Sequence, residues 1–339
     1  MIKYIHVAGT NGKGSVCEFI TASLIKTGYK TGKFTSPHIF DVTERITIND
    51  IPIPKELIPD LPPNRWFETL WETAMVYFEE QEVNYAVIET GIGGLYDCTN
   101  IITPAVSVIT KIALDHTDLL GDSISEIAKH KAGIIKPGIP VVTDPTQSES
   151  AMRVIRETAQ RNNSRLFIPD LTDIPKVSML GEHQKYNALV AAEALRVLGI
   201  TEHDFTAVHV PARFQIVSNN PLIIVDGAHN PSALRATRKA AEAIETTGKR
   251  VIIIGMLKSK DYRSGLENLI FPETEIIFTD GFSENAVPVS ELKKLCENAH
   301  SRKSIKEAID LARSIAGEGG LILICGSLYL AAEALKELL

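Results

Sequence analysis

A glycine-rich run with a single lysine lies near the start of the chain, and its residue types are those that bind phosphate groups. The run HVAGTNGKGS (residues 6–15) joins a strand-like segment to a helical one. Its glycines allow tight turns that bring backbone N–H groups close to a phosphate, and a helix amino terminus adds its positive dipole end. An incidental lysine in a glycine-rich turn is the alternative, which the strand–loop–helix context disfavours. We therefore predict that Lys13 contacts the β- and γ-phosphates of a nucleotide and that Ser15 faces a magnesium ion.

A carboxylate and a histidine follow the next apolar runs of the chain. Glu89 stands at the carboxyl end of residues 85–89, just before a second glycine-rich turn. In open α/β sheets ligand groups gather at the carboxyl ends of strands, and a carboxylate oxygen suits magnesium. An isolated glutamate there can also be a solvated strand end. His116 follows the strand predicted at 106–112, so it can lie near Glu89, although a lone histidine in a turn is more often structural.

Short apolar runs alternate with helical patterns throughout the chain, which is typical of an α/β fold with a mainly parallel sheet. Proline recurs through residues 49–64, so we predict an irregular connection there. The elements predicted in the first half are strands at 4–8, 85–89, 106–112 and 141–143, and helices at about 15–27, 123–132, 149–162 and 185–198.

The polar segment 199–211 interrupts this pattern and suggests a domain boundary. We predict an ATP-binding domain over residues 1–205 and a smaller domain over 206–339, since 339 residues suit two domains. The strands predicted in the second domain are 222–226, 251–255, 275–279 and 321–325, with helical stretches between them.

Composition excludes several classes of function. The formal net charge of −7 argues against broad nucleic-acid binding. The four cysteines form no CxxC pair, which favours free thiols over a zinc site or disulfides. There is no signal-peptide pattern and no apolar window long enough to span a bilayer. We expect a cytoplasmic protein that binds neither membranes nor nucleic acids.

Seven short motifs, taken together, resemble the folylpolyglutamate synthase/dihydrofolate synthase family of the Mur ligase superfamily. They follow one another in the family's order. The motifs are GTNGKGS (9–15), TSPH with ERITIN (35–38, 44–49), ETGIGG with DCTN (89–94, 97–100), LDHT with IAKHKAGIIK (114–117, 127–136), GEHQ with Asn187 (181–184), DGAHNP (226–231) and GSLY (326–329).

The resemblance implies a fold and a reaction. The fold is a P-loop NTPase-like central domain with a mainly parallel sheet, followed by a smaller Rossmann-like domain. In the reaction ATP phosphorylates a carboxylate, and the amine of L-glutamate attacks the acyl phosphate to give an amide. The implied acceptor is a folate or dihydropteroate, the implied metal is magnesium at two sites, and we expect a monomer.

The resemblance also implies roles for individual residues. Lys131 would carry a carbamate that, with His116, holds the second magnesium ion, although a lysine in a last helical turn is usually solvated. Asp226 would lie at the nucleotide, although an aspartate before a turn and helix can also be an N-cap. The implied catalytic residues are Lys13, His116 and Lys131; the metal ligands are Ser36, Glu89, His116 and Lys131; the nucleotide contacts are Asn11, Gly12, Lys13, Gly14, Ser15, Asn187, Arg213 and Asp226.

Some positions differ from the family pattern. Leu95 replaces an arginine that commonly follows GLGG, and Ala212 and Gln215 replace the glycine and glutamate of PGRFE. The chain also begins at the first strand, whereas family members usually carry a preceding segment that helps to cover the pterin site. We therefore expect complete nucleotide and metal sites beside a reduced folate side. The alternatives are a nucleotide-binding regulator without ligase activity, another Mur-type amide ligase, or a simple P-loop phosphotransferase.

Overall fold

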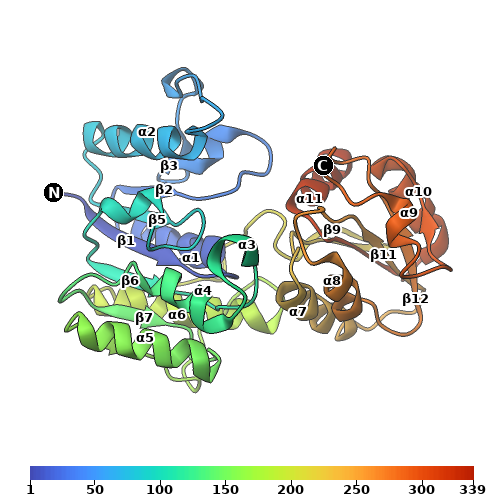
Figure 1. Cartoon of the computed structure of the whole chain (residues 1–339). Helices are drawn as coiled ribbons and strands as arrows, with labels where there is room; N and C mark the ends of the chain where they lie inside the picture. Colours follow the sequence, from blue (N-terminus) through green and yellow to red (C-terminus); the bar gives the residue numbers. More distant parts are fainter. The chain divides into compact units, whose positions relative to one another are not determined.

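The computed structural model describes residues 1–339 and contains two compact units (Figure 1). The first unit comprises residues 1–178 and 183–208, and the second comprises 179–182 and 209–339. The division at 208/209 lies just after the boundary predicted at 205/206. Each unit has its own mainly parallel sheet, so the predicted α/β fold class is confirmed.

The first unit is built on an eight-stranded sheet with β1 near its centre. The strand order is β4-β3-β2-β5-β1-β6-β7-β8, and only the β2–β3 and β3–β4 pairs are antiparallel. Because β1 lies between β5 and β6, the loops that follow these three strands meet at one edge of the sheet. The strands are β1 (Lys3–Ala8), β2 (Thr31–Phe34), β3 (Ile46–Ile48), β4 (Ile51–Pro52), β5 (Tyr85–Glu89), β6 (Val106–Ile109), β7 (Val141–Thr143) and β8 (Leu166–Phe167).

The helices of this unit begin and end close to local sequence signals. A capping box of Ser123 and Glu126 starts α4, and Gly28 follows α1 with a φ of 88°. The proline-rich stretch contains only the short strand β4 and a single 3₁₀ turn, η2 (Lys55–Leu57). The helices are α1 (Lys13–Lys26), α2 (Trp66–Glu80), α3 (Thr117–Leu120), α4 (Ile124–Ala132), α5 (Glu149–Arg161) and α6 (Glu182–Val197), with 3₁₀ turns η1 (Val42–Arg45) and η3 (Cys98–Ile101).

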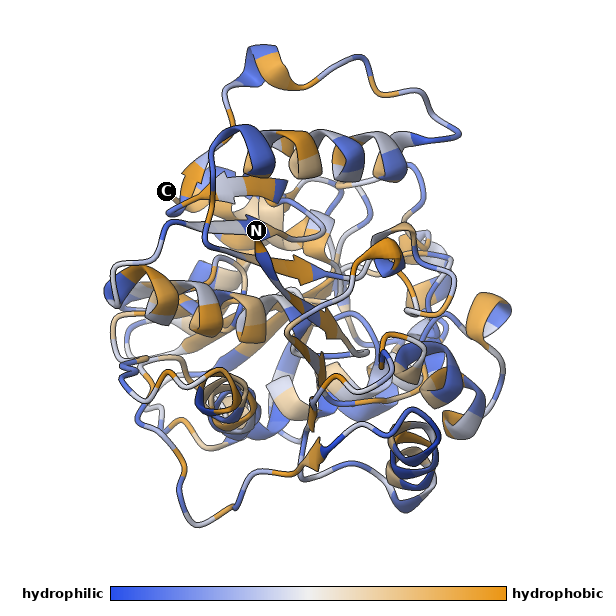
Figure 2. Ribbon diagram, turned by 90° about the vertical axis from the view of Figure 1, so that its left-hand side faces the viewer, coloured by the Kyte–Doolittle hydropathy of each residue, from blue (hydrophilic) through white to orange (hydrophobic).

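Two apolar clusters attach helices to the first sheet. Trp71 and Phe78 of α2 pack with Phe34 of β2 and Ile88 of β5, and a second cluster joins α4 and α5 to β1, β6 and β7. Figure 2 shows the result as mainly hydrophobic strands surrounded by helices of mixed hydropathy. Residues in register on parallel strands point to the same face of a sheet. His6 is in register with Ile88, so it points to the face that α2 covers.

The second unit contains a six-stranded sheet of order β13-β12-β11-β14-β10-β9, in which only β9 is antiparallel. No helix of the chain is both long and apolar enough to cross a membrane. The strands are β9 (Gln215–Asn219), β10 (Leu222–Val225), β11 (Arg250–Ile254), β12 (Thr274–Phe278), β13 (His300–Ser301) and β14 (Leu321–Cys325); the helices are α7 (Pro231–Glu242), α8 (Tyr262–Leu269), α9 (Val289–Leu292), α10 (Ile305–Ala316) and α11 (Leu328–Leu338).

Candidate active site

The glycine-rich loop connects β1 directly to α1, as the sequence predicts. Gly12 caps α1 with a left-handed φ of 90° and supplies no side chain to the helix amino terminus. The first N–H groups of α1 therefore remain available to an anion. A Cβ on Gly12 would overlap the side-chain amide of Asn187 on α6. The fold thus brings Asn187 against the phosphate loop, and Ser15 is buried in the first turn of α1.

Hydrogen bonds to the segment after β6 hold the phosphate loop in place. The backbone N–H groups of Thr10 and Asn11 both donate to the Lys111 carbonyl, at 2.9 and 3.1 Å. The Thr110 hydroxyl donates to the Asn11 carbonyl at 2.8 Å. The hydroxyl of Thr10 accepts from the Ala113 N–H at 3.1 Å. Hydrogen bonds between protein groups therefore fix the shape of the loop.

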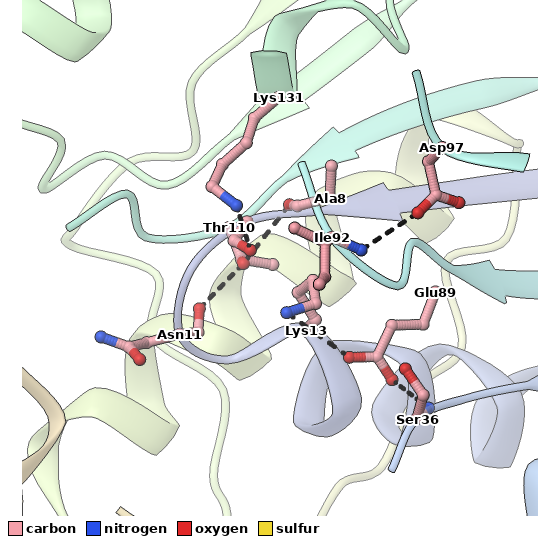
Figure 3. A network of polar contacts seen from close by, with 10 residues as sticks. Ala8, Asn11, Lys13, Ser36, Glu89, Ile92, Asp97, Thr110 and Lys131 are labelled. Carbon is pink, nitrogen blue, oxygen red and sulfur yellow. Dashed lines mark hydrogen bonds and ion pairs between the residues drawn. The ribbon is translucent and has the colours of Figure 1, made fainter. Parts of the chain in front are cut away.

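Glu89 meets the phosphate loop at the end of β5 (Figure 3). Its side chain is only 3% exposed, so it is not a solvated strand end. One carboxylate oxygen lies 3.7 Å from the Lys13 Nζ, and the other accepts a hydrogen bond of 3.0 Å from the Ser36 backbone N–H. Three predicted site residues from α1, β5 and the loop after β2 therefore converge on one point.

We predict that Glu89→Gln weakens the binding of Mg²⁺ in the presence of a nucleotide by at least about tenfold. The amide keeps the shape of the side chain but removes the negative charge that a hard cation prefers. Isothermal titration of the nucleotide-bound protein with Mg²⁺, or with Mn²⁺ as a spectroscopic substitute, measures the change. Glu82→Gln, which changes an exposed glutamate before β5, is the matched control. Equal Mg²⁺ affinity in Glu89→Gln and the parent would exclude Glu89 as a ligand.

Lys131 lies at the end of α4, but it is buried rather than solvated. Its side chain is 4% exposed, and Nζ donates a hydrogen bond of 2.8 Å to the Gly9 carbonyl (Figure 3). Desolvation, and then the positive charge of Lys13, lowers the pKa of Lys131 to about 7. Asp115 and Asp97 oppose this shift, so their charges lie within range of the amine. The amine is therefore substantially neutral near physiological pH.

His116 lies in the loop between β6 and α3. His116 precedes α3 with a left-handed φ of 50°, and its side chain is exposed. The strand β6 ends at Ile109, so the connection to α3 is longer than the predicted strand at 106–112 allows. The neighbouring Asp115 is not among the predicted site residues, but it is the residue of this loop whose charge acts on Lys131.

Asp226 of the second unit fixes a sharply bent segment. Its carboxylate accepts hydrogen bonds from the Phe214 N–H at 2.7 Å and from the Thr237 hydroxyl at 2.9 Å. Phe214 has a left-handed φ of 51°, and Arg213 precedes it, so Asp226 positions the segment that carries Arg213. The N-cap of α7 is Asn230. The interpretation of Asp226 as a helix N-cap is therefore wrong.

Asp97 lies in the DCTN motif but is not among the residues that the sequence predicts for the site. One Asp97 oxygen accepts from the Ile92 N–H at 3.0 Å, and the other accepts from the Thr99 N–H at 3.1 Å. The Asp-x-Thr spacing is the available signal, because this pattern commonly closes a turn. Asp97 thereby organises the glycine-rich turn that follows Glu89.

Comparisons with known proteins agree with this architecture. Residues 7–142 match the family model "Mur ligase middle domain", and residues 212–328 match "Mur ligase, glutamate ligase domain". The dihydrofolate synthase/folylpolyglutamate synthase of Bacillus subtilis is 33% identical over 99% of this chain and 90% of its own length. That alignment extends over 394 residues, more than the 339 of this chain, so segments of the relative have no counterpart here.

Solved structures show the same similarity. A folylpolyglutamate synthase of Mycobacterium tuberculosis, complexed with ADP and AMPPCP, has a TM-score of 0.90 at 26% identity and covers 99% of this chain and 91% of its own. E. coli FolC in complex with DHPP and ADP has a TM-score of 0.89 at 28% identity and covers 99% and 88%. The chain therefore belongs to the folylpolyglutamate synthase/dihydrofolate synthase family of Mur ligases.

Proposed function

We propose that this protein uses ATP to join L-glutamate to the carboxylate of a folate or dihydropteroate. The observation that carries the proposal is the convergence of Lys13, Glu89 and the buried Lys131 on one phosphate loop. Related structures contain matching ligands: E. coli FolC holds DHPP and ADP, and a bifunctional folylpolyglutamate synthase/dihydrofolate synthase holds Mn, AMPPNP and L-glutamate.

The reaction has two steps. A carboxylate oxygen of the acceptor attacks the γ-phosphorus of ATP, the bond to the β–γ bridging oxygen breaks, and ADP leaves. The amine of glutamate then attacks the acyl carbon, phosphate leaves with the bonding electrons, and the nitrogen loses a proton. Lys13 and the amino terminus of α1 neutralise the charge on the transferring phosphoryl group, which is the main task of a protein in such chemistry.

The residues at the site fit magnesium. Glu89 supplies a carboxylate, and Ser15 and Ser36 supply hydroxyl oxygens, which are the hard donors that Mg²⁺ prefers. No group of three or more His, Cys, Asp or Glu side chains gathers to hold a metal, so nucleotide phosphates would have to complete the coordination. When bound, the ion would add positive charge beside the phosphates.

Lys131 fits the proposed carbamate. A buried lysine with a pKa of about 7 offers the uncharged amine to which carbon dioxide adds. The nitrogen bonds to the carbon of CO₂ and loses a proton, and the amine becomes an anion with two oxygen donors. With His116, this group would hold a second magnesium ion.

A phosphate-release assay tests the proposed function. The protein receives ATP, Mg²⁺ and L-glutamate, with dihydropteroate and tetrahydrofolate offered in turn, and mass spectrometry measures the addition of glutamate. We expect phosphate release that needs both glutamate and one of the acceptors. Binding of ATP without glutamate-dependent release would instead identify a nucleotide-binding regulator. Size-exclusion chromatography tests the prediction of a monomer.

A further inference from the structure

A buried histidine connects the strand of the phosphate loop to the turn that follows Glu89. His6 lies on β1 and is 0% exposed, and its Nε2 lies 2.9 Å from the Thr99 hydroxyl oxygen. That hydroxyl lies 2.5 Å from one oxygen of Asp97, and the other oxygen accepts from the Ile92 N–H. These contacts form one chain of hydrogen bonds from β1 to the turn at 91–94.

The proton positions in this chain follow from the chemistry of its members. An ionised carboxylate only accepts hydrogen bonds, so the Thr99 hydroxyl uses its single proton to donate to Asp97. The same hydroxyl oxygen must then accept from His6, which places the imidazole proton on Nε2. The His6 Nδ1 therefore carries a lone pair, and it has no hydrogen-bond partner although it is buried.

A buried nitrogen without a hydrogen-bond partner lowers the stability of the fold, and an apolar side chain at this position would avoid that loss. The flanking strand residues, Ile5 and Val7, are apolar and fully buried. Burial, followed by the charge of Lys136, lowers the pKa of His6 to about 3. The imidazole therefore stays neutral at physiological pH and acts as a fixed donor rather than as a proton carrier.

Other bonds secure the far end of the same loop. The Lys136 Nζ donates to the Asn100 carbonyl at 2.7 Å, and the Asn100 amide donates to the carbonyls of Leu95 and Gly133. Loss of the His6 contact would thus loosen Asp97 without releasing the whole loop. Asp97 is one of the two acids whose charge acts on Lys131, so its position matters to the site.

We infer that His6 and Thr99 are positioning residues that orient Asp97. Through Asp97 they fix the position of the 91–94 turn relative to the phosphate loop. This inference rests on the proposed function for its effect on turnover. His6 and Thr99 act through Asp97, so neither needs to touch substrate. The proposed nucleotide contacts of Lys13 and α1 do not depend on the His6–Thr99–Asp97 hydrogen bonds. An effect on turnover can therefore be separated from an effect on nucleotide binding.

Hydrogen exchange tests the inference without any ligase activity. Ile92 is exposed, so protection of its amide reports the bond to Asp97. In His6→Leu and Thr99→Val we expect the Ile92 amide to exchange at least about fivefold faster than in the parent. His6→Gln keeps a hydrogen-bond donor and Thr99→Ser keeps a hydroxyl, so in these two variants the exchange rate of Ile92 should stay near that of the parent. In the unmodified protein, ¹⁵N NMR should show a proton on Nε2 of His6. A proton on Nδ1, or unchanged exchange in Thr99→Val, would overturn the inference.

Kinetics supply the functional test. Loss of the neutral His6–Thr99 hydrogen bond in His6→Leu is expected to lower kcat about tenfold, while KM for ATP stays within about twofold. The double variant should be no slower than Thr99→Val alone, since both changes break one chain. A slower double variant, or an equal loss of ATP affinity, would contradict the positioning role. If the parent releases no phosphate with either acceptor, the proposed function fails, while the exchange and NMR results still decide the inference.

Discussion

Lys13→Ala is expected to lower kcat/KM for glutamate-dependent phosphate release by roughly a thousandfold. The Lys13 Nζ lies at the head of α1, 3.7 Å from the buried carboxylate of Glu89. In the proposed function its positive charge is the protein's fixed cation for the β- and γ-phosphates, and removal of one preorganised donor typically costs two to three orders of magnitude. The variant should keep its fold, because Lys13 is the first residue of α1, where its side chain is partly exposed and alanine is a good helix former.

Lys26→Ala is the matched control for this variant. Lys26 ends the same helix, is exposed, and pairs with Asp204 at 3.1 Å. Such surface pairs contribute little to stability, so turnover and thermal denaturation should match the parent. Near-normal turnover in Lys13→Ala would refute the phosphate-loop assignment. A large loss in Lys26→Ala would mean that α1 tolerates no change, so the Lys13 result would not be specific.

The local features of the site could be predicted from the sequence, because they depend on neighbours along the chain. Gly12 must adopt a left-handed backbone conformation before α1, and a glycine-rich run between strand and helix indicates this directly. The place of Glu89 in the site can be predicted from the length of its strand, because ligand groups gather at the carboxyl ends of strands in α/β sheets. These rules need only a few consecutive residues.

The contacts between distant segments could not be predicted. Lys131 looks like a lysine at a helix end, and nothing nearby in the sequence shows that its amine meets the Gly9 carbonyl. Asp226 looks like an N-cap until the fold brings Phe214 to it. His6 lies in an apolar run, and only strand register shows which face it shares with Ile88. Each of these depends on long-range packing.

Lys131→Arg is the second large change, and we expect it to lower turnover by at least about a hundredfold. Arginine keeps a positive charge but cannot form a carbamate, and a permanent cation would repel Lys13 and magnesium. Lys131→Ala should be equally slow, but a small carboxylate such as acetate should partly restore it. The matched control is Lys129→Arg, on the exposed face of the same helix. Full activity of Lys131→Arg would exclude the carbamate. An acid-labile mass increment on the parent that is absent from Lys131→Arg would support it.

The pH dependence of stability provides a test that needs no turnover. The pKa of Lys131 falls from 10.5 to about 7 on folding, so between these values the unfolded chain binds a proton that the folded one does not. The free energy of unfolding should therefore rise with pH across this window. Below pH 7 the folded chain also carries the charged ammonium group, and its burial lowers the free energy of unfolding by the full amount. In carbon dioxide-free buffer, Lys131→Met should remove this rise, so its gain in stability over the parent is larger at pH 6 than at pH 9. Denaturant unfolding at both values measures the difference. An equal gain at both would mean that Lys131 keeps an ordinary pKa, and the uncharged amine that carbon dioxide requires would then be scarce.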